Sequence, residues 1–433
     1  MPRDSGRGVV RPYMYALGAA AVLSALFLVK NVDLRVYWYG VNGFFSGTRP
    51  AYGPNSGLGF PMEYRYPPVT YLILFPLSKM SLRVAGILWT LGAWAASAGA
   101  VWLGLRVRGL RFDGASIVAC SAFMAAYVVL AIRYANVQPF VIAAIFAALI
   151  LSETQPIAAG ILLALGITFK IWPILFLPLL FWRARRRAAI FTVISLVVLW
   201  MFPLAIFGAA RYGWLLKEWY AAVGRVGATY SEFYYFPGQS LRGVLLRYLT
   251  PVVPPLNSFP AIHVFSFSPE SAVVTWGIVS LVVYCFFVVL MLRSDARRLW
   301  AWDGMAFVLY SLLEPYGVKS GLISLGPAAL TAGCLFTIGR RKDRRANGLF
   351  LGACMLSVLG AIIQYKPWQR FLLAAGLDFW TEILLLSAFV VWILYTRVPE
   401  SLTSSRLGAD GADATSSGGS STSSATGVSA SSM

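Results

Sequence analysis

Residues 31–52 read NVDLRVYWYGVNGFFSGTRPAY and directly follow an apolar run, Tyr13–Val29, that is long enough to cross most of a bilayer. The run has no convincing small-residue cleavage site, so we expect a first membrane anchor rather than a signal peptide. The aromatic residues after Asp33 are typical of a helix at the membrane interface. Asp33 is therefore predicted to be held at the membrane surface, where a carboxylate can accept a proton from a substrate hydroxyl. A helix-end charge or a local ion pair with Arg35 is the alternative.

The composition of the chain is that of a membrane protein. Of its 433 residues, 58% are hydrophobic and 12% are charged, and the mean hydropathy is +0.70; soluble domains carry about 25% charged residues. The net charge of +19 comes from arginine clusters between apolar runs, a pattern typical of cytoplasmic loops. These clusters are RVRGLR (106–111), RARRR (183–187), RSDARR (293–298) and RRKDRR (340–345), with Arg3, Arg7 and Arg11 at the start. The charge thus indicates membrane topology, and no nucleic-acid partner is expected.

Placing the arginine clusters in the cytoplasm predicts an all-α polytopic integral membrane protein with about 12 transmembrane helices. Residues 1–12 and the Ser/Gly-rich tail 398–433, which is expected to be disordered, are then cytoplasmic and flank a membrane domain over 13–397. Residues 31–81 and 209–270 form two long external loops. The expected spans are 13–30, 83–105, 115–133, 137–152, 156–182 as two short helices, 188–208, 271–292, 302–316, 321–339, 347–363 and 377–396.

Two segments need a separate interpretation. Residues 66–81 are short for a span and contain Pro76, so they form either an interfacial helix in the first external loop or a short second span. The region 156–182 is interrupted at FKIWP (169–173), which predicts two short helices that meet near Lys170.

With this topology, the unusual polar residues of the chain all lie at the external face. Ionisable groups near membrane depth are costly and tend to face a cavity or a partner, so we expect one external polar cavity. Its candidate residues are Asp33, Arg35, Glu63, Arg65, Arg133, Asn136, Gln138, Lys170, Gln239, Arg242, Glu314, Lys319, Lys366 and Arg370.

Most of these residues also have a structural interpretation. The two prolines of FPMEYRYPPV (60–69) can begin a helix, Asn136 can cap one, and Lys170 can extend toward water. Lys319 can pair with Glu314 or bind a phosphate as a point charge. These alternatives stay open on the sequence alone.

The remaining motifs bear on anion and metal binding. FPGQSLRGVLLR (236–247) predicts a loop and then a helix whose first turn carries Gln239 and Arg242, which suits an anion or a sugar. The four cysteines have no paired spacing, and the only histidine, His263, lies in a polar loop and is expected at the surface. No dedicated metal cluster is therefore predicted, although one or two carboxylates could hold a divalent cation.

Taken together, these motifs resemble glycosyltransferase family 87, the polyprenyl-phosphate-mannose-dependent α-mannosyltransferases of the GT-C superfamily. Asp33 with the aromatic residues, Gly47 and Pro50 after it is similar to the first-loop pattern of that family. The resemblance covers roughly residues 12 to 395 in the right order. One departure is LEPYGVKSG (313–321), which has a lysine where the family often has histidine. The other matching motifs are YRYPP (64–68), ANVQPFVIAAI (135–145), AAGILLALGITFKIWPILFLPLLFWRARRRAA (158–189) and FPGQSLRGVLLR.

The resemblance implies a GT-C fold in the plasma (inner) membrane, with Asp33 as the catalytic base on the external side. The donor would be polyprenyl-phosphate mannose, the acceptor a glycolipid or glycan of the cell envelope, and the reaction inverting. No cofactor is expected beyond this donor substrate. Cations for the donor phosphate would be Lys319 first, then Arg133, Lys170 and Arg370. Residues near the sugar or acceptor would be Arg35, Tyr37, Glu63, Tyr64, Arg65, Tyr66, Asn136, Gln138, Gln239, Arg242 and Glu314.

Two other functions compete with this one. A transporter or flippase for a lipid-linked sugar would favour two related halves, and the chain has no internal repeat. A non-catalytic scaffold of the cell envelope would use the same polar residues for helix packing.

Overall fold

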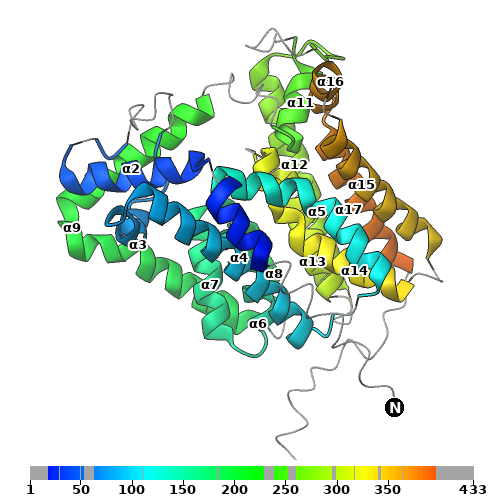
Figure 1. The fold of residues 1–433 in the computed structure, drawn as a ribbon, viewed down its shortest axis with the longest axis horizontal. Helices are drawn as coiled ribbons and strands as arrows, with labels where there is room; N and C mark the ends of the chain where they lie inside the picture. The colour runs from blue at the N-terminus through cyan, green and yellow to red at the C-terminus, as the bar shows by residue number, and fades with distance from the viewer. Residues whose placement is uncertain are drawn as a thin grey trace, which may run out of the picture.

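The computed structural model is almost entirely helical over the residues it describes: 18–28, 30–48, 50–52, 63–110, 112–182, 185–228, 238–251, 260–294, 299–315, 317–339, 343–363 and 365–395. The helices form one bundle (Figure 1). The predicted terminal segments 1–12 and 398–433 lie outside the described residues.

In chain order the elements are η1 (Ser24–Leu28), α2 (Val32–Ser46), α3 (Val69–Ser78), α4 (Leu82–Val107), α5 (Gly114–Tyr134), α6 (Gln138–Leu151), α7 (Pro156–Phe169), η2 (Trp172–Phe176), α8 (Leu177–Leu180), α9 (Arg186–Ala228), α11 (Leu241–Leu249), α12 (Pro269–Arg293), α13 (Leu299–Leu313), η5 (Lys319–Leu325), α14 (Gly326–Gly339), α15 (Arg344–Ile362), α16 (Lys366–Ala374) and α17 (Leu377–Tyr395).

Seven helices of the described chain are long and apolar enough to cross a membrane. Four further apolar helices, α3, α6, α7 and α13, are shorter. The protein is therefore all-α where it is described and passes the membrane several times, while the expected number of about 12 spans stays a prediction. The seven long helices are α4, α5, α9, α12, the continuous η5–α14 segment, α15 and α17.

Local capping explains where several helices begin and end. α5 starts after Asp113, whose carboxylate accepts a hydrogen bond from the Ser116 N–H at 2.7 Å in a capping box. α7 ends before Lys170, whose backbone is extended, so the predicted interruption at that lysine is confirmed. The second short helix expected there is smaller than predicted, because η2 and α8 are only five and four residues long.

The region predicted as the loop 209–270 differs from the expectation because much of it is helical. α9 does not end near residue 208 but continues to Ala228 through a kink at Gly208. Gly208 has a φ of 73°, a conformation that costs glycine little. The short α11 follows in the same region. α3, at 10 residues, is too short to cross a bilayer alone.

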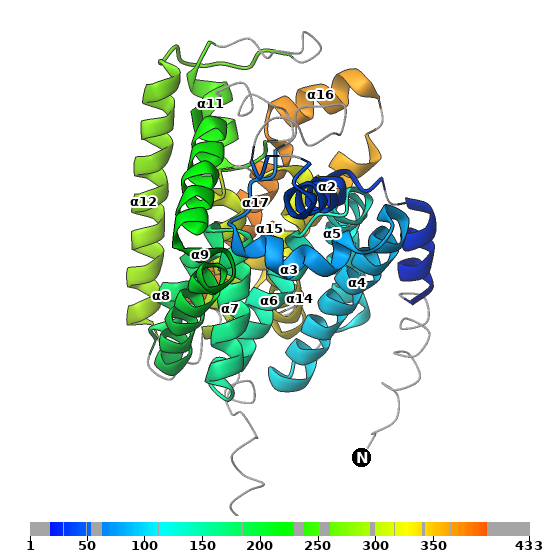
Figure 2. The same cartoon turned by 90° about the vertical axis from the view of Figure 1, so that its left-hand side faces the viewer.

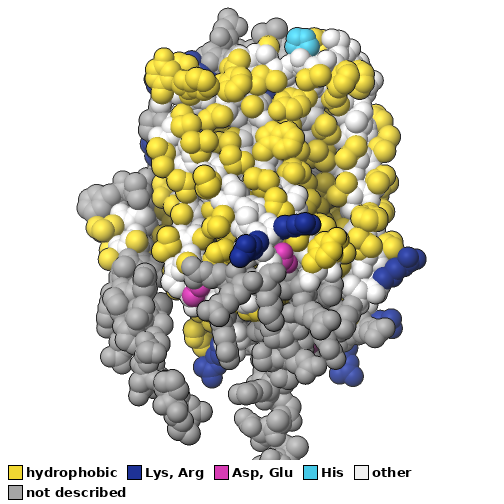
Figure 3. All heavy atoms as spheres, turned by 90° about the vertical axis from the view of Figure 1, so that its right-hand side faces the viewer, with side chains coloured by type: hydrophobic (Ala, Val, Ile, Leu, Met, Phe, Trp, Pro, Cys, Tyr) yellow, Lys and Arg dark blue, Asp and Glu magenta, His cyan; other side chains and the backbone are white. Residues whose placement is uncertain are grey.

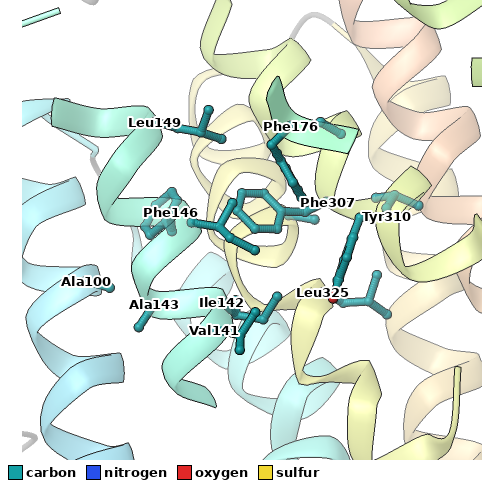
Figure 4. Packing of buried hydrophobic residues seen from close by; sticks show 14 of the residues in the cluster. Ala100, Val141, Ile142, Ala143, Phe146, Leu149, Phe176, Phe307, Tyr310 and Leu325 are labelled. Atoms are coloured by element: carbon teal, nitrogen blue, oxygen red, sulfur yellow. The ribbon is translucent and has the colours of Figure 1, made fainter. Parts of the chain in front are cut away.

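Large aromatic side chains pack together at the centre of the bundle. Phe146 of α6 and Phe176 of η2 pack against Phe307 of α13, with ring centroids 6.0 Å and 4.8 Å away (Figure 4). All three are buried, and inside a membrane protein such rings hold helices together through close van der Waals packing. This packing sets the position of α6 relative to α13, and both helices carry residues of the candidate site.

A buried ion-pair network ties the bundle together at its arginine-rich end. Arg185 is completely buried and donates two parallel hydrogen bonds to Asp303, at 2.8 Å and 2.9 Å. Its Nε lies 3.3 Å from Glu153, and Arg108 Nη2 lies 3.4 Å from Asp303 and 2.9 Å from the carbonyl of Leu149. The network connects the ends of α4 and α6 to the first turns of α13.

The outer faces of the bundle are apolar. Figure 3 shows hydrophobic side chains over most of one face, with the charged side chains gathered toward its lower edge. On α12, exposed aliphatic and aromatic side chains run along the helix, including Val274, Ile278, Leu281 and Phe286. An apolar belt bounded by charges suits the hydrocarbon region of a bilayer. His263 is exposed, as predicted.

Candidate active site

Helix α2 carries Asp33 and packs on α3, as the ribbon in Figure 2 shows. The contact between them is a stack of aromatic rings. The ring of Tyr71 lies between Phe44 and Tyr64, with centroids 4.3 Å and 4.4 Å away. Gly40 comes so close to Tyr64 that a Cβ there would lie 2.6 Å from its ring. The aromatic residues that the sequence assigned to an interfacial helix therefore hold α2, and with it Asp33, in one position.

A chain of hydrogen bonds connects Asp33 to the core of the bundle. The half-buried Asp33 carboxylate accepts a hydrogen bond at Oδ2 from Asn136 Nδ2 at 2.7 Å. Asn136 Oδ1 accepts from the backbone N–H of Gln138 at 2.7 Å, and Gln138 Nε2 donates to Tyr310 Oη at 3.2 Å. Asn136, which precedes the N-cap residue Val137, thus binds the first N–H of α6 and also orients Asp33. Arg35 is exposed, and its side chain has no ion pair with Asp33 among the described contacts.

The environment of Asp33 changes its acidity. Burial raises the pKa of the Asp33 carboxyl to about 6, while the hydrogen bond from Asn136 and the charge of Lys170 lower it. A carboxyl with this pKa is mostly ionised at neutral pH and still takes up a proton readily, which suits a general base. Among the described residues, none donates a hydrogen bond to Oδ1, so this oxygen can accept a further hydrogen bond.

Two tyrosines lie beside Asp33. The hydroxyls of Tyr37 and Tyr66 are 3.0 Å apart and their rings pack edge to face at 5.2 Å. Burial raises the pKa of both phenols above the usual value, so both keep their protons at neutral pH. The charges of Asp33, Arg65 and Glu314 all act on Tyr66. The pair can therefore present hydroxyl groups to a polar ligand at this place.

Lys170 forms an ion pair that the sequence did not specify. Its Nζ lies 2.9 Å from Glu314 Oε1, and Glu314 is buried. The lysine therefore meets a carboxylate instead of extending toward water, and Glu314 pairs with Lys170 rather than with Lys319. Because the charge of Lys170 also reaches Asp33, this cation acts on two carboxylates at once.

Lys319 belongs to a second polar cluster. Its Nζ lies 3.9 Å from Asp378 Oδ2 and 3.4 Å from the carbonyl of Gly360. Asp378 accepts a hydrogen bond from Tyr127 Oη at 2.9 Å, and its backbone N–H donates to Gln239 Oε1 at 3.3 Å. The long contact between Lys319 and Asp378 leaves the ammonium able to turn toward an added anion.

Sequence reasoning missed the carboxylates of α17. Besides Asp378, Glu382 is completely buried and accepts a hydrogen bond from Ser311 Oγ at 2.8 Å. The signal was present in GLDFWTEILLL (376–386), where two acidic residues four apart interrupt an apolar run. Ionisable residues inside a span usually mark a functional or paired position.

The other predicted site residues are less closely connected to Asp33. Arg242 is buried with its guanidinium carbon 5.1 Å from the ring centroid of Trp276. Arg133 is exposed, Arg370 lies on α16 and Glu63 is half-buried ahead of the aromatic stack. In the part of the chain that the structure describes, no group of three or more His, Cys, Asp or Glu side chains is arranged to hold a metal ion.

One family model matches the central part of the chain. Residues 64–265 match the sequence model of Glycosyltransferase family 87. Tyr66, Asn136 and Lys170 lie inside this region, whereas Asp33 and Lys319 lie outside it. No curated protein and no solved structure matches the chain. Over residues 64–265 the chain is thus similar to glycosyltransferase family 87, and together with its multiple apolar helices this indicates a membrane glycosyltransferase.

Proposed function

We propose that the protein is a GT-C mannosyltransferase that takes its sugar from a polyprenyl-phosphate donor and passes it to a glycolipid or glycan acceptor. Asp33 is the general base, and a β-linked donor gives an α-linked product by inversion. The site faces the outside of the plasma (inner) membrane in this proposal, because α5 begins just after the cluster 106–111 and ends beside Asn136, the hydrogen-bond partner of Asp33.

The environment of Asp33 is the observation that carries the proposal. The carboxylate is fixed through Oδ2 by Asn136, keeps Oδ1 for a substrate, and has a pKa of about 6. It lies on an aromatic helix too short and too polar to count among the spans, which suits a base at the membrane interface, where a lipid-borne donor is also located. Lys170, which pairs with Glu314, supplies a cation nearby.

The reaction follows from these groups. The acceptor O–H gives its proton to Asp33 Oδ1 as its oxygen forms a bond to the anomeric carbon of the donor sugar. The bond between that carbon and the phosphate oxygen breaks, and the electron pair leaves with the polyprenyl phosphate. Cations placed where this charge develops stabilise the transition state, and we assign Lys319 to that task, with Lys170 as the second cation.

Tyrosine hydroxyls and amides provide the contacts that orient the sugar and the acceptor. Tyr37 and Tyr66 offer protonated hydroxyls next to the base. Gln138 continues the hydrogen-bond chain from Asn136 into the core. The position of Asp33 is therefore set by the start of α6 and not by a loop. Holding the acceptor hydroxyl and the donor sugar in a near-attack geometry can supply a large part of an enzyme's rate enhancement.

We expect the activity to follow the protonation of Asp33. In the native protein kcat/KM should fall as pH drops through about 6, because only the ionised carboxylate accepts the proton. Asn136→Ala removes a hydrogen bond that favours the ionised form, so its acid limb should move to higher pH. Measuring kcat/KM against pH for both proteins tests this, and an unshifted acid limb in the variant would contradict the role of Asn136.

We expect Lys319→Met to weaken use of the donor. Loss of a cation at the leaving phosphate should lower kcat/KM by about 10²-fold, with a higher KM for the donor and an unchanged KM for the acceptor. Lys79→Met, an exposed lysine at the end of α3, is the matched control. Native kinetics in Lys319→Met would move the assignment to Lys170.

The decisive experiment uses the whole protein in proteoliposomes, with radiolabelled polyprenyl-phosphate mannose and a membrane lipid extract as acceptor. A labelled product with the native chain and none with Asp33→Asn would support the proposal. Movement of the donor across the bilayer without a new product would indicate a lipid-linked-sugar transporter. Absence of both would indicate a non-catalytic scaffold.

A further inference from the structure

Helix α16 lies at the level of the membrane surface. It joins α15 to α17, which are both long enough to cross a membrane and pack side by side. Two consecutive spans cross in opposite directions, so the nine residues of α16 must lie at the end opposite Arg344, where α15 begins. Figures 1 and 2 show α16 at that end of the bundle, beyond the ends of α15 and α17.

One face of α16 is aromatic and exposed. Tyr365, Trp368 and Phe371 are spaced three residues apart, and their exposed fractions are 66%, 60% and 45%. The rings of Trp368 and Phe371 contact each other edge to face at 6.2 Å. Tyrosine and tryptophan concentrate at membrane–water interfaces, where the rings meet the headgroups. An exposed aromatic row of this kind is unusual on a surface that faces water only.

The helix is fixed by its neighbours rather than free to swing. Gln239 Nε2, Arg247 Nε and Tyr248 Oη each donate a hydrogen bond of 2.9 Å to the carbonyls of residues 373, 374 and 375. These bonds satisfy the last carbonyls of α16. They also hold the buried side of the helix against α11, so the aromatic side keeps one orientation.

A second exposed apolar segment is hydrogen-bonded to Tyr248, the residue that also binds the end of α16. The backbone N–H groups of Val264 and Phe265 donate to the carbonyl of Tyr248 at 2.8 Å and 3.1 Å. Val264, Phe265 and Phe267 have exposed fractions of 67%, 54% and 45%. This segment directly precedes α12, another helix long enough to span. We call Tyr365, Trp368, Phe371 and residues 264–267 the aromatic rim.

Two cations accompany the rim. Lys366 is exposed and Arg370 is half-buried, and their spacing of four residues places them on one side of α16, next to Trp368. We propose that the aromatic rim lies in the headgroup layer of the leaflet at this end, and that Lys366 and Arg370 bind the phosphates of anionic phospholipids there. The transfer reaction proposed above uses Lys319 and Lys170 and neither of these cations. Arg370, which the resemblance placed near the donor phosphate, is here assigned to lipid headgroups instead.

The test uses the full chain in nanodiscs that contain equal amounts of phosphatidylcholine and phosphatidylglycerol, without any sugar donor. Trp368 is replaced by photoreactive p-benzoylphenylalanine, and the cross-linked partner is identified by mass spectrometry. We expect phospholipid adducts with phosphatidylglycerol in excess. Lys366→Gln should reduce that excess about fivefold, and the pair Lys366→Gln/Arg370→Gln should reduce it further by a similar factor.

Arg344→Gln/Arg345→Gln is the matched control, because it removes two exposed cations from the opposite end of α15. This variant should keep the native excess at Trp368. Cross-links to protein only, or no cross-link at all, would show that the rim does not meet lipid. Equal yields of the two phospholipids in the native protein would show that the cations do not select anionic headgroups. If the double variant fails to fold, Lys366→Gln alone still decides the question.

Discussion

Asp33→Asn is expected to lower the transfer rate by about 10²–10⁴-fold, the usual contribution of a general base. The amide keeps the shape of the carboxylate, and its oxygen can still accept the hydrogen bond that Asn136 now donates to Oδ2. The substitution should therefore leave the fold and donor binding intact and remove only the proton acceptor. Initial rates with saturating donor, together with the donor affinity measured separately, provide the measurement.

The control for this variant is Glu153→Gln, the same chemical change at the opposite end of the bundle, where Glu153 lies near Arg185. It should transfer sugar at the native rate. Native activity in Asp33→Asn would require another base and would remove the central residue of the proposal. Equal losses in both variants would indicate a general effect of removing a carboxylate instead of a catalytic one.

Arg185→Ala is expected to destabilise the protein by about 3–5 kcal/mol, because it leaves Asp303 buried without its main partner. The effect should be visible as a lower midpoint of thermal or detergent-induced unfolding. The pair Arg185→Met/Asp303→Leu replaces both charges by apolar groups and should recover most of this loss. Arg186→Ala removes an exposed neighbour of Arg185 and should change stability by less than about 0.5 kcal/mol. A native midpoint in Arg185→Ala would show that the network does not hold the helices together.

Sequence patterns predicted those helices whose limits are set by local chemistry. The apolar run after the cluster 106–111 predicted a span over 115–133, close to α5, and the break at Lys170 follows from the proline-containing step after it. The second half of α9 was not predictable in this way. The apolar pattern stops near Gly208, and only the tertiary structure shows that the chain bends there and remains helical.

The candidate site, too, was predictable only where local sequence determines it. Asp33 and Asn136 each have a local signature, but they are 103 residues apart, and their hydrogen bond exists only because α2 packs near the start of α6. Arg185 is part of a basic cluster that indicates topology, and nothing in the sequence reveals that Asp303 lies opposite and draws it inside. Ion-pair partners distant in the chain require the fold.

The two hydrogen bonds of Asn136 also make the two oxygens of the Asp33 carboxylate unequal. Its oxygen is occupied by the start of α6, so its NH₂ group must face Asp33, and the amide cannot be turned around without losing both bonds. In the proposed reaction, the proton taken from the acceptor would therefore go to Oδ1, the oxygen away from Asn136. An acceptor alcohol would then have to approach on the Oδ1 side of the carboxylate, and the regiochemistry of the product would depend on which hydroxyl can reach that oxygen.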